Sequence, residues 1–306
     1  MKNIVALLAT IMLCAAPQVV ARSRHDARVE LGRRLFYDAD LSRDGTMSCA
    51  TCHEQRHGFA DGNRVHPGVT DEPGRRNVPG LANVGHFSPL TWADPRQTTP
   101  ERQAAVPVFG THPVEMGMAG MQAEIPRRLG RDPCYRQMFA AAFPGRDQRP
   151  DFAKVARALA SFERSLISRD APFDRNQLSP EAIAGRSVFR RSCASCHKGP
   201  DFTDMAFHRL GRADPAAPDQ GLYEATGKQA DRGRIRTPSL RNVAVTAPYW
   251  HDGSALTLDD AIARHGLALA PARSRALAAF LGALTDDRFL NNPAFSLPQT
   301  ACGMKL

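Results

Sequence analysis

The chain has few aromatic residues, no long apolar run after its N-terminus and no long run of basic residues. Only 7% of its 306 residues are aromatic, and two are Trp. Rings normally dominate cores of this size, so we expect large apolar groups other than side chains to complete the core. After the N-terminus no apolar run approaches the roughly 20 residues that cross a bilayer, which predicts no membrane span. Despite a net charge of +9, no Lys/Arg run exceeds two residues. The sequence therefore predicts no nucleic-acid-binding stripe.

The N-terminus is typical of an export signal. Lys2 supplies a positive start, Ile4 to Ala16 is an apolar run, and Val19-Val20-Ala21 is a cleavage site of small and apolar residues. The run is too short for a membrane anchor. We therefore predict a signal peptide over residues 1–21 and a periplasmic mature protein.

The seven cysteines divide into a signal residue, two motifs and a pair. Cys14 lies in the predicted signal. Four others belong to two Cys-x-x-Cys-His motifs, whose members are Cys49, Cys52, His53, Cys193, Cys196 and His197. In this motif two thiols one turn apart bind the haem vinyl groups, and the histidine becomes an axial ligand. Zinc or a redox dithiol would not require the histidine twice. Cys134 and Cys302 either form a disulfide in an oxidising compartment or remain separate thiols.

A degenerate repeat precedes the two motifs. Leu31 to Phe36 and Ala184 to Phe189 are similar helical segments, and the second has a cap at Ser179 and a proline after it. The repeat predicts a mainly α fold with two cytochrome c-like domains, whose long loops pack around two covalent haems. Their boundaries are predicted at 22–170 and 171–306. Further helices are expected at 122–131, 152–168, 258–265 and 272–284, with few strands.

Methionine is absent where a second axial ligand would be expected. None of the nine methionines lies between residues 206 and 303, the region that would supply a thioether to the second haem. Histidines 208, 251 and 265 are available instead. His265 follows a predicted helix and precedes Gly266, so it is either a ligand or a surface histidine at a helix C-terminus.

Four further segments carry a family resemblance. They are residues 49–61, 76–81, 113–117, and 236–243 continuing through 246–254. Over nearly its whole mature length the chain resembles the bacterial di-haem cytochrome c peroxidases and MauG. The stretch Phe109 to Gly117, and histidine in place of the usual methionine, resemble the MbnH-like di-haem enzymes in particular.

The resemblance implies a set of site residues. The haem of His53 is the peroxide-reactive one, with Glu115 as its acid–base group and Gln103 and Pro107 beside it. Trp92 relays electrons between the haems, with core packing as the alternative. A calcium ion is implied between them, and its ligands map onto Asn77, Thr246 and Pro248. His265 is the second ligand of the haem held by His197. A loop histidine at His66 either plugs the first haem or is exposed to solvent.

The resemblance also implies an activity. Two imidazoles favour higher iron oxidation states, which suits an oxidase of the MauG type. Such an enzyme uses hydrogen peroxide, through a high-valent state shared by two haems, to oxidise an aromatic residue of a small exported partner. In MbnH-like enzymes the partner binds copper and the product is kynurenine. Two alternatives stay open: a hydrogen-peroxide-detoxifying cytochrome c peroxidase fed by an electron carrier, and a non-enzymatic di-haem carrier.

Overall fold

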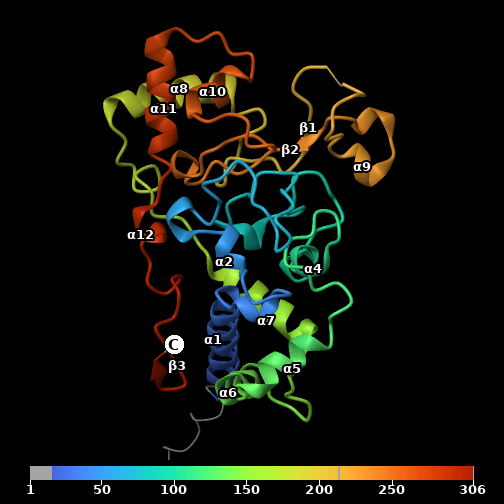
Figure 1. Ribbon diagram of the computed structural model, residues 1–306. Coiled ribbons are helices and arrows are strands. Elements are labelled where there is room, and N and C mark those ends of the chain that lie inside the picture. The colour runs from blue at the N-terminus through green and yellow to red at the C-terminus, as the bar shows by residue number, and fades with distance from the viewer. Residues whose placement is uncertain (1–15, 213, 306) are drawn as a thin grey trace, which may run out of the picture.

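The computed structural model describes residues 16–212 and 214–305, with side chains from residue 25 onward. Helices gather at two ends of the molecule, and long loops lie between them (Figure 1). The helices are α1 (Ala16–Phe36), α2 (Cys49–Cys52), α3 (Pro100–Gln103), α4 (Ala105–Phe109), α5 (Glu124–Arg131), α6 (Pro133–Ala142), α7 (Phe152–Ser165), α8 (Pro180–Ser192), α9 (Tyr223–Thr226), α10 (Leu258–Ala263), α11 (Pro271–Gly282) and α12 (Asp287–Leu290). Single 3-10 turns cover Ala39–Leu41, Gln55–His57, Val84–His86, Gln229–Asp231 and Val243–Val245.

Strands are few, as predicted. In the described residues β1 (Phe207–His208) pairs antiparallel with β2 (Ile235–Arg236), and β3 (Thr300–Ala301) pairs antiparallel with β4 (Met304–Lys305). Each strand has two residues, so the pairs pin loops and form no extended sheet. The mainly α prediction is confirmed.

Two helix crossings repeat the same contact at opposite ends of the molecule. A Cβ added to Gly32 of α1 would lie 1.9 Å from the carbonyl oxygen of Ala158 in α7. One added to Gly185 of α8 would lie 1.7 Å from the carbonyl oxygen of Ala276 in α11. Only glycine permits backbones to approach this closely. The two crossings therefore belong to one repeated structural unit.

Aromatic rings flank both crossings in the same way. The rings of Phe36 and Phe162 lie 5.2 Å apart, and those of Phe189 and Phe280 lie 5.0 Å apart. The side chain of Ser179 caps α8 by accepting from the amide of Ala182, as predicted. The repeat read from the sequence is thus present in space.

Most predicted helices are found, with shorter ends. The segment expected at 122–131 begins at Glu124, and the one at 152–168 ends at Ser165. The last two occupy Leu258–Ala263 and Pro271–Gly282. Helix α6 was not predicted, although Asp132 caps it and Pro133 occupies its first turn.

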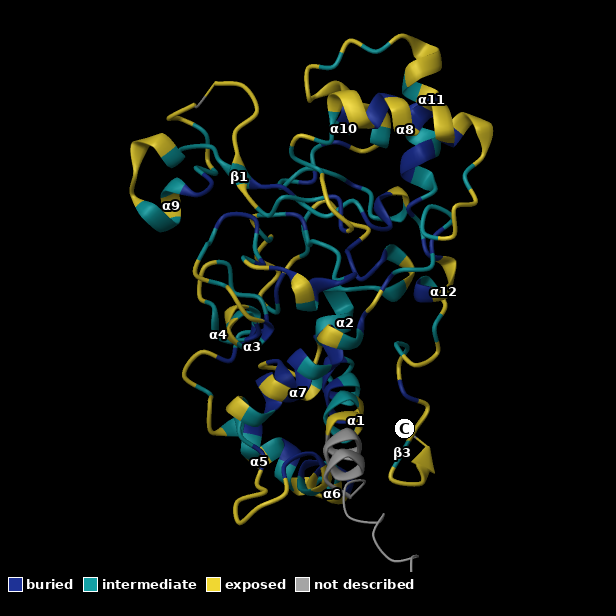
Figure 2. Cartoon of the chain, turned by 180° about the vertical axis from the view of Figure 1, so that it is seen from behind, coloured by how far each residue is buried: buried dark blue, intermediate teal, exposed yellow. Residues whose placement is uncertain are grey.

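Two buried asparagines connect the loops to the helix pairs. The amide of Asn83 donates to the Leu166 carbonyl (2.8 Å), and that of Asn242 donates to the Leu284 carbonyl (3.1 Å). The Asn242 side chain also donates to Ser168 Oγ, while the Ser168 amide donates to Asn83 Oδ1. Buried segments consequently run through the central loops as well as through α7 (Figure 2).

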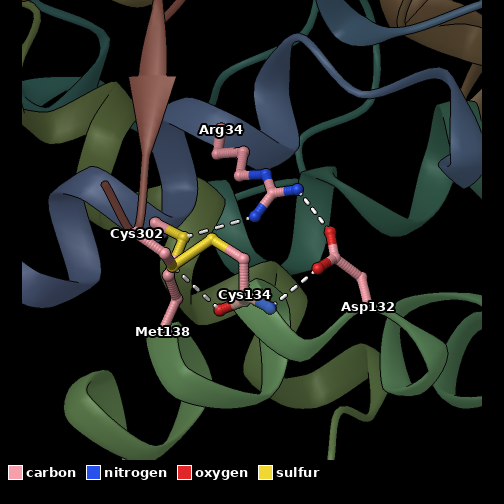
Figure 3. Close-up of a disulfide and its surroundings, with 5 residues drawn as sticks. All are labelled: Arg34, Asp132, Cys134, Met138 and Cys302. Carbon is pink, nitrogen blue, oxygen red and sulfur yellow. Dashed lines mark hydrogen bonds and ion pairs between the residues drawn. A yellow bond between two sulfur atoms is a disulfide. The ribbon is translucent and has the colours of Figure 1, made fainter. Parts of the chain in front are cut away.

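The C-terminal tail returns to the first helix pair. Tyr37 Oη donates to the Phe295 carbonyl (2.7 Å), and Arg33 Nε donates to the Ser296 carbonyl (2.7 Å). A disulfide then joins Cys134 of α6 to Cys302, across 168 residues of sequence (Figure 3). Of the two alternatives left open for these cysteines, the structure has the disulfide.

The predicted signal peptide, residues 1–21, lies largely outside the described residues and stays a prediction. Within the described part of the chain, no helix combines the length and apolar character needed to cross a membrane.

Candidate functional site

Both motif histidines are oriented by a backbone carbonyl. Nδ1 of His53 donates to the Phe59 carbonyl oxygen (2.7 Å), and Nδ1 of His197 donates to that of Phe202 (3.0 Å). A carbonyl only accepts, so the proton is on Nδ1 and the Nε2 lone pair is free for a metal. Burial lowers the pKa of His53, and it lowers the pKa of His197 to about 4. Both imidazoles are therefore neutral, as metal ligation requires.

The two residues whose carbonyls accept these hydrogen bonds share an unusual backbone conformation. Phe59 and Phe202 are buried and adopt positive φ values of 62° and 53°. The left-handed region costs a bulky residue about 1–3 kcal/mol and persists only where surroundings enforce it. Because the same strained conformation occurs at both motifs, we infer that it orients the carbonyl toward the motif histidine.

The second motif opens into a cavity of about 470 Å³. His265 lies on its wall beyond the end of α10, and its Nδ1 donates to the Ala261 carbonyl (2.7 Å), which leaves Nε2 free. The rings of His197 and His265 are 6.4 Å apart. Two metal–imidazole bonds of roughly 2 Å and two ring radii together span about this distance. The pair therefore fits an iron held between two imidazoles.

A residue that lines the same cavity, Trp250, has an unpartnered donor. Trp250 Nε1 is buried and has no hydrogen-bond partner among the described residues, and the Trp250 ring lies 5.5 Å from that of His265. Buried donors normally have a partner. A group in the cavity with acceptor oxygens, such as a haem with its propionates, fits this orphaned donor. Trp250 lies in the segment 246–254, which carries the family resemblance, but no role was predicted for it.

The first motif opens into a cavity of about 510 Å³ that brings the predicted catalytic residues together. Gln103 from α3, Pro107 from α4 and Glu115 from the following loop line it together with His53. The Met116 amide donates to the Pro107 carbonyl (2.9 Å), and the Val69 amide donates to the Glu115 carbonyl (2.8 Å). The Glu115 backbone is therefore fixed from both sides.

Two carboxyl groups in this cavity have raised pKa values. Burial raises the pKa of Glu115, with no compensating cation. Burial also raises the pKa of Glu163 to about 8, and Glu163 lies on the cavity face of α7 beside Leu159. Sequence reasoning missed Glu163. Its spacing four residues after Leu159 places it on the apolar stripe of α7, which was the available signal.

His66, a histidine near the first motif, has a protein partner. His66 lines the cavity, and its Nδ1 bonds Asp61 Oδ2 at 2.6 Å. Its side chain is only 17% exposed, so the expectation of a solvent-exposed loop histidine was wrong. The buried Asp61 holds it inward. Among the described residues, no histidine ring packs opposite His53 as His265 packs opposite His197.

Trp92 and the predicted calcium ligands line one or both of these cavities. Trp92 lines both cavities, is buried, and donates from Nε1 to the Asn77 carbonyl (2.7 Å). Asn77 also lines both cavities, while Thr246 and Pro248 line the second. The three predicted calcium ligands therefore line one cavity, and Trp92 lies between the two cavities.

The paired motifs and their cavities define a class of protein, the di-haem c-type cytochromes. A family model described as di-haem cytochrome c peroxidase matches residues 26–181. The methylamine utilization protein MauG of Methylophilus methylotrophus is 34% identical over 74% of this chain and 68% of its own. Cytochrome c551 peroxidase of Nitrosomonas europaea is 31% identical over 88% and 82%.

A solved structure is similar across most of the chain. It is a MauG-like protein associated with microbial copper homeostasis, with 35% identity and a TM-score of 0.84 over 89% of this chain and 93% of that one. The chain belongs to the di-haem cytochrome c peroxidase and MauG family of oxidoreductases. Membership implies two covalent haem c groups, and the fit tests above agree with that cofactor.

Proposed function

We propose that this protein is a periplasmic oxidase of the MauG type, which uses hydrogen peroxide to oxidise an aromatic residue of a partner protein. The observation that carries the proposal is the pairing of His197 with His265, whose rings lie 6.4 Å apart. Two imidazoles make higher oxidation states of iron easier to reach than histidine with methionine. This favours an enzyme that stores oxidising equivalents over one that accepts electrons from a carrier.

The residues of the two motifs would hold the cofactors. In the proposal two cytochrome c-like domains, residues 22–170 and 171–306, each bind one haem through the cysteines and histidine of their motif. The haems supply the redox chemistry with peroxide. Asn77, Thr246 and Pro248, which all line the second cavity, would hold a calcium ion, since oxygen donors suit calcium.

Glu115 is the proposed proton carrier of the first cavity. Reduction of peroxide requires a proton to move from one oxygen atom to the other. A carboxyl group with a raised pKa, fixed at its backbone and facing the same cavity as His53, is suited to this transfer. Gln103 and Pro107 would shape the space beside it, and Trp92 would carry electrons between the two haems.

The proposed partner is a small exported protein that binds copper. The similar MauG-like structure is associated with copper homeostasis, which supports a partner of this kind. Four electrons would leave an aromatic residue of the partner, most simply a tryptophan, and travel to the second haem, where two molecules of hydrogen peroxide accept them in turn. Water would supply the oxygen atoms and the C2 carbon would leave as formate, so that the tryptophan becomes kynurenine. The partner residue need not enter either cavity.

The experiment combines the purified holoprotein, hydrogen peroxide and a candidate partner, namely a small exported copper-binding protein that contains tryptophan. Mass spectrometry of the partner should show the mass change of tryptophan converted to kynurenine, only when peroxide and enzyme are both present. Rapid peroxide consumption with reduced cytochrome c, without a modified partner, would instead identify a detoxifying peroxidase. An absorption spectrum unaffected by peroxide would contradict both enzymes and leave an electron carrier.

A further inference from the structure

Arg236 is a buried cation at the centre of the molecule. It is 3% exposed, ends β2, and lines both cavities. Its side chain reaches across to the segment before Trp92: Nε donates to the Thr91 carbonyl (3.0 Å) and Nη2 to the Leu90 carbonyl (3.2 Å). Its own amide donates to the Trp92 carbonyl (2.8 Å). Arg236 thus holds the backbone of Trp92 while presenting its charge to the cavities.

No carboxylate neutralises this charge. Within residues 16–212 and 214–305 Arg236 forms no ion pair, and Nη1 donates to the Thr237 carbonyl (3.1 Å) and to Met205 Sδ (3.6 Å). The other deeply buried arginine of this region, Arg241, is 5% exposed and pairs with Asp174 at 2.6 Å. An unpaired buried charge costs several kcal/mol. Burial lowers the pKa of Arg236 only to about 10, so the side chain is still cationic at neutral pH.

Both cavities are expected to receive an anionic group. Each haem implied by the family carries propionate carboxylates. The Arg236 guanidinium attracts them as a fixed cation, and one of its five N–H donors, on Nη2, has no protein partner among the described residues and is available to a carboxylate. The geometry points to Arg236 as a carboxylate-binding residue shared by the two haems, its guanidinium acting as counter-ion to propionates on both sides of the wall between the cavities. This inference does not depend on oxidation of a partner protein.

A shared cation has a measurable consequence for both irons. A fixed positive charge stabilises the reduced form of a nearby haem, because that form carries one positive charge fewer. Removing it should therefore lower the midpoint potentials of both haems together. Neither peroxide nor a partner is needed to observe the shift.

The test is an optical redox titration of the holoprotein and its Arg236→Met variant. We expect the midpoints of both haems to fall in Arg236→Met and to stay close to wild type in Arg236→Lys, which keeps the charge. The control is Arg190→Met, which removes an exposed arginine three residues before Cys193 and should change neither midpoint appreciably, because solvent screens it. A fall at only one haem, or no larger fall than in Arg190→Met, would overturn the shared role.

Arg236→Lys keeps the inference testable if Arg236→Met does not fold. Lysine retains the charge and loses the planar fork, so the resonance Raman bands of the propionates, which respond to hydrogen bonding, should shift for both haems in Arg236→Lys. Unchanged propionate bands in this variant would equally overturn the assignment.

Discussion

The two motif-bearing halves of the molecule have the same frame and different cavity walls. In each half a glycine lets two helices cross, a phenylalanine pair flanks the crossing, and a left-handed phenylalanine turns its carbonyl toward the motif histidine. These features concern attachment and orientation of the cofactor. Because both halves have these features, the features cannot explain a difference in chemistry between the halves.

The difference lies in what faces the histidine. Opposite His197 lies the ring of His265, whereas the cavity of His53 contains the carboxyl groups of Glu115 and Glu163. Glu163 and Leu281 occupy equivalent places in the two halves, each one residue after the flanking phenylalanine, and each lines its cavity. Under the proposed function, the shared frame would hold a haem in each half, and a few residues on loops and on one helix face would make the first site open and the second closed.

The largest expected effect comes from removing the carboxyl group of Glu115, the proposed proton carrier of the first cavity. Glu115→Gln should slow the reaction with hydrogen peroxide about 10²–10⁴-fold, since an amide cannot take up the proton. In the wild type the rate should rise as the pH climbs through the raised pKa of Glu115, because the ionised form is the base. Stopped-flow spectra across pH measure both effects. Glu30→Gln, at an exposed residue of α1, is the control. An undiminished rate in Glu115→Gln would exclude the proposed role.

Next in size is the exchange of His265, the proposed second axial ligand in the second half. His265→Met should raise the midpoint potential of the second haem while leaving peroxide reactivity at the first, since axial ligands set haem potentials over a range of about 0.8 V. Redox titration with absorption spectra gives both readouts. The same substitution at His251, another residue of this cavity, serves as the control. If His265→Met and His265→Ala both keep the wild-type spectrum and midpoint, His265 is no ligand.

Local features of the sequence predicted the frame well. The segments before the motifs and the cap at Ser179 depend on short-range chemistry, so they could be read without coordinates. The missed features depend on distant partners. Glu163 lies inside a predicted helix, where a glutamate is usually exposed to solvent. Only the structure shows that its carboxyl group faces a cavity. Arg236 belongs to the segment 236–243 that carries the family resemblance. That no carboxylate in the described part of the chain pairs with it could be seen only after the structure showed its neighbours.

A smaller effect is expected on the pH dependence of stability, because Glu163 can titrate and its equivalent in the second half, Leu281, cannot. The folded protein holds a proton on Glu163 up to a pKa of about 8, whereas the unfolded chain releases it near 4.5. The folded state therefore binds more protons across this window, and its stabilising contribution, present in full below pH 4.5, is lost as the pH rises through 8. Glu163→Gln and Glu163→Leu should both flatten this decline in the free energy of unfolding, measured from pH 5 to 8.5. An equally steep decline in both variants would place the titrating group elsewhere.

The smallest effect tests whether the frame is as similar in the two halves as it looks. Gly32→Ala and Gly185→Ala each place a methyl group against a backbone carbonyl, at 1.9 and 1.7 Å, so the helices must separate. Overpacking of this kind costs about 1–3 kcal/mol, and denaturant unfolding of the holoprotein should show similar losses for the two variants. Gly130→Ala in α5 is the matched control: nothing lies within 4 Å of its added Cβ, and a helical alanine should stabilise by up to about 1 kcal/mol. A loss in only one of the two halves would mean that one crossing has become free to adjust. The frame would then have diverged together with the cavities.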